Sequence, residues 1–311
     1  MLRSIFVVNF LSTQISAIAL KQEWIPERDE FSSIEDIARK MNSIKAIGST
    51  FALRDEYPMT ECQIEIMLQI TNQFENGPTN NGLIYDSCEV TADSQGISAG
   101  FIQFTTCCGD LLSLCNDYIQ QYQSDKNFFC ISYIPALQAA NSAPECGEDG
   151  NSVQLNMSKY GIDSSFCPKW TETADTNANF RAMQRQTALN EYLGTLQSLI
   201  QEYNIKTPGV LAQLFDANVQ LGAVSDIAAA ATVKANGSPA NGTSELTWLG
   251  AFLEARTSYT INLGGAYLDT VYRIQAFKGG IYDTGNLNFT DNKIILPADD
   301  SWAMSPITIT C

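Results

Sequence analysis

Nine cysteines constrain the fold of this chain more than any other feature, since they run from position 62 to position 311. None forms a C-x-x-C pair, and the chain contains no histidine. Zinc sites use cysteine and histidine at such spacings, so we do not expect a metal. Disulfides in an oxidising compartment are the better interpretation. The odd number leaves one thiol that is either free or bonded to another chain, and the connectivity does not follow from the sequence.

The first twenty residues have the composition of an export signal. Arg3 precedes a short apolar stretch, and small residues follow at Ala17 and Ala19. This pattern predicts a signal peptide over 1–19 and a secreted, extracellular protein. The apolar stretch is too short to span a bilayer comfortably, and no later segment is long and apolar enough, so no membrane partner is expected.

The length and the charge exclude several classes of protein. The chain has 311 residues, of which 45% are hydrophobic, enough for a sizeable core. Its net charge of −16 excludes a basic surface for nucleic acid. Residues 20–55 are expected to form an N-terminal extension, and 56–311 the main domain. Four N-x-S/T sequons would suit glycosylation in a eukaryote: Asn156, Asn236, Asn241 and Asn288.

Hydrophobic periodicity predicts a mostly helical protein, of the α+β class, with one small antiparallel sheet. A helix over 60–75 begins with the capping-box pair Thr60 and Gln63 and stops at Gly77-Pro78. Segment 83–106 is rich in β-branched residues around a turn signal, which predicts a short antiparallel strand pair or a strand and a loop. Further helices are expected at 109–122, 177–204, 208–221, 244–258 and 266–276. Segments 141–175 and 233–244 are expected to be a long loop and a flexible insert, and 279–311 an irregular tail or short strands.

Without histidine, acid–base chemistry falls to carboxylates. Glu75 ends an apolar helix, where the free carbonyl groups carry partial negative charge and disfavour an ionised carboxylate. The neighbouring Phe74 would also shield the Glu75 carboxyl group from water. Both effects raise a carboxyl pKa, so Glu75 is a candidate general acid. Asp93 lies in the following turn, where backbone N–H groups favour the ionised form. An aspartate in a Asp-Ser-Gln-Gly turn can equally be structural.

The spacing of these residues resembles the signature of glycoside hydrolase family 46, the chitosanases. Glu75-Asn76, Tyr85, Asp93 and Asp110 follow the family's intervals, and "SAGFIQFTTCCGDLL" resembles its next segment. The likeness is tight from about 64 to 118. It is looser to about 275, where "YIPALQAAN" and "LGAFLEAR" also resemble family segments. The resemblance implies a lysozyme-like fold with two lobes and a small sheet beside the catalytic cleft.

The resemblance also implies a role for each matching position. Glu75 matches the general acid and Asp93 the general base. Ser98 matches the hydroxyl that holds the attacking water, and Asp110 a carboxylate that contacts a glucosamine amine. Tyr85 matches a signature tyrosine beside the site, where packing is the alternative. The family inverts anomeric configuration, which implies carboxyl groups roughly 6.5–9.5 Å apart.

Two further positions match a buried ion-pair network of the family. Asp216 and Arg256 each stand alone as a charge on an apolar helix face, although solvent exposure or other partners are equally open. Arg273 is a weaker match. Gln95 stands beside the general base, where the family has Arg or Asp, and the resemblance implies that this position contacts the sugar. Gln103 stands where the family has Gly.

The resemblance implies an endo-acting, inverting hydrolase of chitosan, the signal peptide predicts that it is secreted, and an acidic protein would attract this cationic polymer. A lysozyme-like hydrolase of another amino-sugar polymer is the second hypothesis, because Gln95 removes a charge from the site. A non-catalytic glycan-binding protein of the same fold is the third. No metal and no organic cofactor is implied.

Overall fold

The structure is a computed structural model that describes residues 57, 59–77, 82–92, 94–146, 154–297 and 306–311. All of them belong to a single unit, residues 54–311. The predicted signal peptide, the predicted N-terminal extension over 20–55 and Asp93 lie outside the described residues. No helix in the described ranges is long and apolar enough to cross a bilayer.

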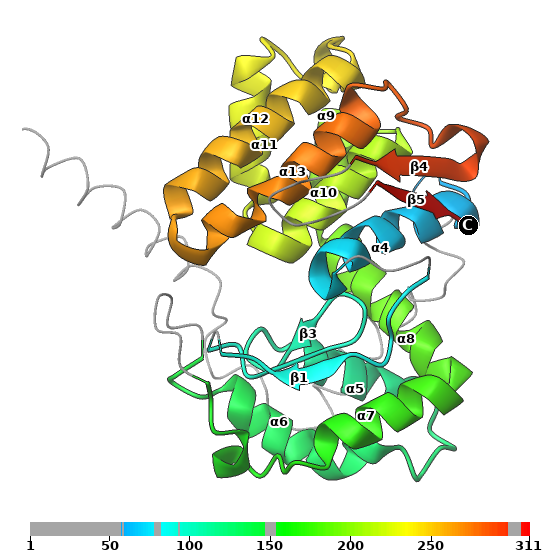
Figure 1. Cartoon of the computed structure of the whole chain (residues 1–311), viewed down its shortest axis with the longest axis vertical. Helices are drawn as coiled ribbons and strands as arrows, with labels where there is room; N and C mark the ends of the chain where they lie inside the picture. The colour runs from blue at the N-terminus through cyan, green and yellow to red at the C-terminus, as the bar shows by residue number, and fades with distance from the viewer. Residues whose placement is uncertain (1–56, 58, 78–81, 93, 147–153, 298–305) are drawn as a thin grey trace, which may run out of the picture. The chain divides into compact units, whose positions relative to one another are not determined.

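The unit is mostly helical, as the sequence predicts, and its elements form two groups (Figure 1). The lower group in this view contains β1 (Cys88–Val90), β2 (Ile97–Ala99), β3 (Phe104–Thr105), α5 (Asp110–Gln121), α6 (Ile134–Asn141), α7 (Phe166–Thr176) and α8 (Ala178–Ala188). The upper group contains α9 (Gln197–Tyr203), α10 (Pro208–Leu221), α11 (Val224–Lys234), α12 (Glu245–Leu263), α13 (Val271–Phe277), β4 (Lys293–Leu296) and β5 (Ile307–Thr310). Helix α4 (Glu61–Asn76) lies at the border and packs against α10.

Helix α4 forms where the capping pattern predicts it. Thr60 accepts a hydrogen bond from the backbone N–H of Gln63, whose side chain bonds back to the N–H of Thr60. This reciprocal pair satisfies two of the N–H groups that a helix start leaves without partners. The helix ends at Gly77, which adopts a φ of 78° that side chains disfavour. Ten of its residues, Ile64 and Ile66 to Phe74, are buried, so the helix is a core element that fixes the direction of its last turn.

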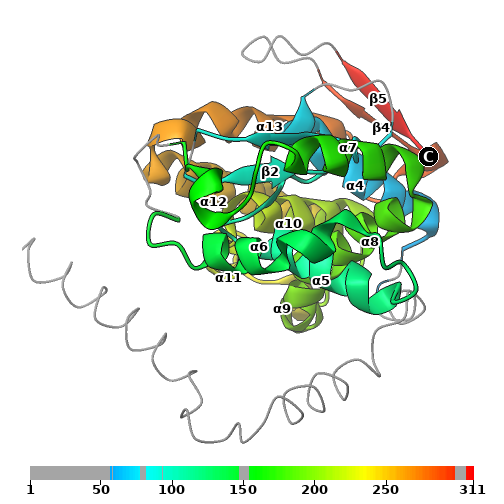
Figure 2. The ribbon, with the colours of Figure 1, turned by 90° about the horizontal axis from the view of Figure 1, so that it is seen from below.

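The predicted strand pair is confirmed as part of a three-stranded antiparallel sheet in the order β1-β2-β3. Ser98 of β2 lies opposite Glu89 of β1 and Thr105 of β3. All three residues of β2 are buried, as expected for a central strand. A second sheet pairs β4 with β5 in the tail, so the prediction of a single small sheet is wrong (Figure 2). Alternation of buried and exposed residues in β4, over only four residues, is the signal for this sheet.

Two segments are more regular than the sequence predicts. Helix α7 begins at Phe166, inside the segment 141–175 that was expected to be a loop, because Phe166, Trp170 and Ala174 bury one helical face. The insert 233–244 is a hydrogen-bonded turn around the short 3-10 helix η5 (Pro239–Asn241). Ser238 is buried there and its carbonyl accepts from Thr243 N. Polar composition alone therefore misassigned both segments.

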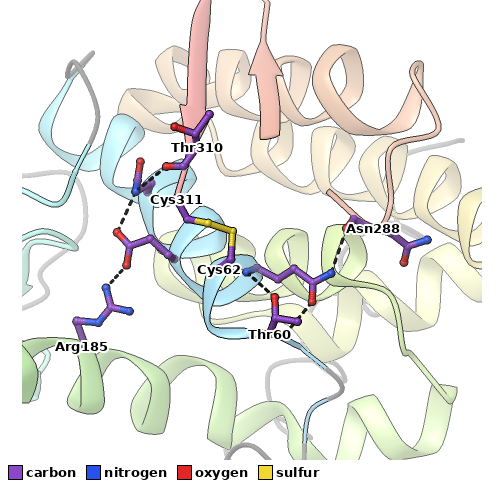
Figure 3. Close-up of a disulfide and its surroundings, with 9 residues drawn as sticks. Thr60, Cys62, Arg185, Asn288, Thr310 and Cys311 are labelled. Carbon is purple, nitrogen blue, oxygen red and sulfur yellow. Dashed lines mark hydrogen bonds and ion pairs between the residues drawn. A yellow bond between two sulfur atoms is a disulfide. The ribbon is translucent and has the colours of Figure 1, made fainter. Parts of the chain in front are cut away.

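Four disulfides confirm the oxidised interpretation of the cysteines. They join Cys62 to Cys311, Cys88 to Cys167, Cys107 to Cys146 and Cys115 to Cys130. The ninth cysteine, Cys108, is exposed and lies in none of them. The first disulfide ties the C-terminal residue to the first turn of α4, beside the capping pair of that helix (Figure 3). It fixes β5 against α4, 249 positions earlier in the chain.

Candidate active site

Glu75 lies in the last turn of α4, with 18% of its side chain exposed. Its Oε1 atom is 2.8 Å from Nη1 of Arg273, which comes from α13 and lies over the ring of Phe74. The hydroxyl of Tyr272 donates to the carbonyl of Phe74, so α13 also contacts the helix end directly. Residues next to Glu75 are thus held in place by packing from a helix nearly two hundred positions later.

Asp216 holds Arg273 from the side away from Glu75. Nη2 of Arg273 lies 2.7 Å from Oδ1 of Asp216, and Nη2 of Arg256 lies 2.7 Å from Oδ2. The side chains of Asp216 and Arg256 are completely buried, and that of Arg273 is 5% exposed. Helices α10, α12 and α13 therefore contribute Asp216, Arg256 and Arg273 to a row of ion pairs, Arg256–Asp216–Arg273, which ends at Glu75. Buried charges are costly unless paired, and these pair with one another.

The environment raises the pKa of Glu75 above its ordinary value, as the sequence predicts. Burial is the largest cause, and the nearby Asp216 charge adds to it, while Arg273 and Arg256 act in the opposite direction. Burial would also raise the pKa of Asp216, but the two arginines hold it below its ordinary value. Glu75 is therefore the carboxyl group of this cluster that takes up a proton first.

Arg273 is the residue that sequence reasoning ranked too low. Asp216 and Arg256 were the stronger matches, yet only Arg273 reaches Glu75 directly. Its signal in the sequence is the same as theirs, a single charged residue on an apolar helix, here "VYRIQAF". Burial lowers the pKa of Arg256 to about 10, whereas Asp216 and Glu75 raise that of Arg273 despite its burial. Arg273 thus stays charged next to Glu75.

Asp93, the predicted general base, lies outside the described residues, but its neighbours form the predicted turn. The N–H and hydroxyl of Thr91 both donate to the carbonyl of Gly96, which closes the loop between β1 and β2. Ser98, the predicted water-positioning residue, is 4% exposed on β2. Its role and the separation of the Glu75 and Asp93 carboxyl groups stay predictions.

Asp110 begins α5, and its carboxylate is largely occupied by the protein. Oδ1 accepts from the backbone N–H groups of Thr105 and Leu111, at 2.7 and 2.9 Å, and Oδ2 accepts from the hydroxyl of Tyr192 at 2.5 Å. Burial raises the pKa of Asp110 to about 6 although these three bonds lower it. A sugar amine could reach only the remaining lone pairs of Oδ2.

Tyr192 is a site residue that the sequence did not indicate. It lies on the π-helical segment η3 (Leu189–Leu193) and its ring packs near Phe215 of α10. Burial raises the pKa of Tyr192, and the charges of Asp110 and Glu75 raise it further. Tyr192 is therefore close enough to both carboxyl groups to sense their charge. Nothing in "LNEYLG" distinguishes this tyrosine from a core residue.

Tyr85 is half-buried and contacts residues of α7 and α8, and its role beside the site stays a prediction, with packing as the alternative. Its carbonyl accepts from the ring N–H of Trp170 at 2.9 Å, and its ring contacts Phe101. Burial raises the pKa of its hydroxyl, while a hydrogen bond from Arg185 lowers it. Arg185 also pairs with Glu65 of α4, beside the Cys62–Cys311 disulfide (Figure 3). Arg185 thus links α8 to the helix that carries Glu75, and the Tyr85 hydroxyl bonds to Arg185.

The two departures from the family pattern, Gln95 and Gln103, both lie in hydrogen-bonded positions. The carbonyl of Gln95 accepts from Cys107 N and from the hydroxyl of Thr106, and its amide oxygen contacts the Cys108 thiol. Gln103 adopts a φ of 57°, a conformation typical of glycine. Its amide donates to Oδ1 of Asn76 at 2.8 Å and to the Ser87 hydroxyl at 3.0 Å. Gln103 thereby fixes the side chain that follows Glu75.

The donor set matches acid–base chemistry. Within the part of the chain that the structure describes, no group of three or more Cys, Asp or Glu side chains could hold a metal ion. The site instead combines a carboxyl group of raised pKa with a guanidinium that is held by a buried carboxylate. A carboxylic acid whose raised pKa lets it protonate the leaving-group oxygen is typical of glycoside hydrolases.

The comparisons with known proteins agree with this class. Residues 69–291, more than half of the chain, match the model of glycosyl hydrolase family 46, and the chain belongs to this family. It is 27% identical over 200 residues to a chitosanase of Bacillus subtilis (strain 168), covering 62% of this chain and 66% of that protein. It is 26% identical over 230 residues to a chitosanase of Streptomyces sp. (strain N174), covering 72% and 75%.

A solved structure shows the same fold. The mutant chitosanase from Bacillus subtilis MY002, complexed with 6 GlcN, superposes with a TM-score of 0.67 at 22% identity. The superposition covers 81% of this chain and all of that one. The predicted fold class is thereby confirmed. Membership of family 46 shows that the protein is a glycoside hydrolase.

Proposed function

We propose that this protein is a secreted, endo-acting chitosanase that cleaves β-1,4-linked glucosamine polymers with inversion. The observation that carries the proposal is the contact between Glu75 and Arg273, backed by Asp216 and Arg256. Relatives that are chitosanases and a similar structure with 6 GlcN bound support the substrate class. Membership of the family supports hydrolysis as the reaction.

Glu75 acts as the general acid in this proposal. Its raised pKa keeps a proton available for the leaving oxygen. Once the proton is transferred, Arg273 lies 2.8 Å from the new carboxylate and stabilises it. The charges of Glu75, Arg273, Asp216 and Arg256 then cancel, so the product state leaves no net charge in the buried cluster.

Asp93 acts as the general base and Ser98 as the residue that positions the water. Asp93 follows a strand of the three-stranded sheet and Ser98 lies on the next strand. Asp110, held by Tyr192, and Gln95 line the sugar subsites in this proposal, whereas Tyr85 supports the site by packing. Asp93→Asn is expected to lose activity as Glu75→Gln does, and activity restored by added azide supports the base role.

The charge of the protein supports a cationic substrate. The net charge of −16 attracts protonated glucosamine units and speeds their encounter with the enzyme at low ionic strength. The proposed export signal over 1–19 places the enzyme outside the cell, where a polymeric substrate is accessible. The disulfides suit that oxidising compartment.

The test is hydrolysis of fully deacetylated chitosan, with the anomer of fresh product read by NMR. We expect release of reducing ends in the α configuration from the β-linked polymer. Release of the β-anomer would contradict inversion. Absence of release from chitosan, with cleavage of partly acetylated chitin or peptidoglycan, would assign the enzyme to another amino-sugar polymer. Binding without cleavage of any polymer would contradict the enzymatic proposal.

A further inference from the structure

Arg256 is held by few contacts for a completely buried cation. Its Nη2 donates to Oδ2 of Asp216 and to the amide oxygen of Gln220. Its Nε and Nη1 have no hydrogen-bond partner among the described residues. Because a buried guanidinium is costly without acceptors, each of the two contacts matters for where Arg256 lies.

The side-chain nitrogen of Gln220 is also bonded, and this bond orients its oxygen towards Arg256. It lies one turn after Asp216 on α10, so both side chains face Arg256. Its amide N–H₂ donates to the hydroxyl of Thr270, at the end of the 3-10 helix η6 (Gly265–Thr270). Thr270 donates in turn to the carbonyl of Tyr267 at 2.7 Å. The amide oxygen of Gln220 is therefore directed to Arg256.

We propose that Gln220 is a positioning residue for Glu75, which acts through Arg256 and Asp216, and that Thr270 fixes the orientation of its amide. The proposal rests on the function proposed above for Glu75. Gln220 is the neutral member of a network whose other residues around Glu75 are charged, and its side chain is partly exposed. It can therefore be replaced without placing a new group in the core.

The physical reason is competition for Asp216, which both arginines share. Without the Gln220 oxygen, Asp216 becomes the sole acceptor that Arg256 has among the described residues, and the guanidinium, whose Nε and Nη1 have no partner there, can turn further towards it. Asp216 consequently neutralises Arg273 less, and Arg273 acts more strongly on Glu75. Gln220→Leu should therefore lower the pKa of Glu75.

A carboxylate at position 220 has the opposite effect. It would pair with Arg256 and release Asp216 to Arg273, and it adds negative charge to the network. Gln220→Glu should therefore raise the pKa of Glu75. The charged and titratable groups that influence Glu75 are Arg273 of α13, Arg256 of α12, Asp216 of α10 and Tyr192 of η3. All of them remain in both variants, so opposite shifts would report position 220 itself.

The experiment is a pH titration of the Glu75 carboxyl by ¹³C NMR in protein labelled at glutamate. The Glu75 signal is assigned by its loss in Glu75→Gln. We expect shifts of opposite sign in Gln220→Leu and Gln220→Glu, each of roughly half a pH unit. Shifts of the same sign, or none in either variant, would overturn the proposal.

Gln275 offers a matched control, because it is exposed on α13, two residues after Arg273. Gln275→Leu and Gln275→Glu make the same chemical changes at a solvated position. We expect far smaller shifts of the Glu75 signal, since solvent screens the added charge. Shifts as large as those at position 220 would mean that any nearby charge suffices, and would overturn the positioning role.

Enzyme kinetics give a second readout. On chitosan, the basic limb of the kcat profile should move to lower pH in Gln220→Leu and to higher pH in Gln220→Glu, with KM nearly unchanged. Equal losses in both variants without a moved limb would indicate a structural role only. If the wild-type enzyme does not cleave chitosan, the proposed function fails, while the NMR titration still tests Gln220.

Thr270→Val tests separately whether Thr270 fixes the orientation of the Gln220 side-chain amide. It removes the acceptor for the Gln220 N–H₂ group and leaves the charged residues untouched. We expect a smaller shift than in Gln220→Leu, in the same direction, because the amide can then turn its nitrogen to Arg256. An unchanged titration would overturn the role of Thr270. Thermal unfolding of each variant checks the fold, and Gln220→Glu conserves size should Gln220→Leu be unstable.

Discussion

Arg273 donates to Glu75 through Nη1 at 2.8 Å and to Asp216 through Nη2 at 2.7 Å. One planar guanidinium therefore joins the exposed end of the site to its buried support. Arginine suits this position because its fork of donors can bind two carboxylates at once and stays charged when buried. The geometry of Glu75 consequently depends on Asp216 and Arg256, whose side chains are completely buried.

Replacing Asp216 should affect both stability and the pH profile. Asp216→Asn leaves two buried guanidinium groups without their shared carboxylate, which should cost about 3–5 kcal/mol of unfolding free energy. The negative charge of Asp216 raises the pKa of Glu75, so its loss should lower that pKa. Urea unfolding and the basic limb of the kcat profile, which should move to lower pH, measure these effects.

Asp283→Asn is the control for this change. Asp283 pairs with Lys278 at 2.7 Å, but about half of each side chain is exposed. Exposed pairs contribute little to stability, so this variant should unfold like the wild-type protein. A stability loss in Asp216→Asn no larger than in Asp283→Asn would contradict the buried pairing.

Asp110 should make stability depend on pH between about 4 and about 6. Its pKa in the folded protein is raised to about 6, so the folded state keeps a proton that the unfolded state has released. Stability should therefore fall as pH rises through this window, by about 3 kcal/mol from this group. Unfolding free energies at a series of pH values measure it. The difference between wild type and Asp110→Asn should change across the window, and a constant difference would show that Asp110 titrates normally.

The disulfide between Cys62 and Cys311 should stabilise the fold without serving the chemistry. Replacing both cysteines with serine removes a cross-link between residues 249 positions apart, which should lower the free energy of unfolding by about 2–5 kcal/mol. Activity at low temperature should persist, because β5 and the start of α4 lie at the opposite end of the helix from Glu75. Thermal unfolding and initial rates test this. Loss of activity with an unchanged melting temperature would contradict it.

Gln103→Gly tests how Asn76 is held. Glycine relieves the strained φ of 57° but removes the bonds to Asn76 and Ser87, so stability should change by no more than about 1 kcal/mol. Asn76 would keep its bond to the carbonyl of Phe101 but lose the one that fixes its oxygen. We expect kcat/KM on chitosan to fall several-fold. An unchanged kcat/KM would mean that Gln103 only replaces the glycine of the family.

Local signals predicted the elements that carry the site. The capping box and Gly77 bound α4 correctly, and the β-branched segment with its turn signal predicted the hairpin that contains Ser98. Both features depend on residues close together in the chain. The capping pattern also explains why the position of Glu75, at the end of a long buried helix, could be recognised.

Contacts between distant segments could not be predicted in the same way. Arg273 and Arg256 look alike in the sequence, and only the packing of α13 against the end of α4 decides which one reaches Glu75. Tyr192 bonds to Asp110 across 82 positions, through a π-helical turn that has no sequence signature. The disulfide partners likewise follow from the fold and not from the spacing of the cysteines.

The most direct test of the account is turnover of chitosan by Glu75→Gln. Glutamine conserves the shape of the side chain but cannot donate the proton, so kcat should fall by roughly 10²–10⁴-fold while polymer binding and the fold are retained. Glu254→Gln, at an exposed position paired with Lys234, should keep wild-type activity and serves as the control. Wild-type turnover in Glu75→Gln would contradict the assignment of Glu75 as the acid and, with it, the role of the Arg273–Asp216–Arg256 chain in catalysis.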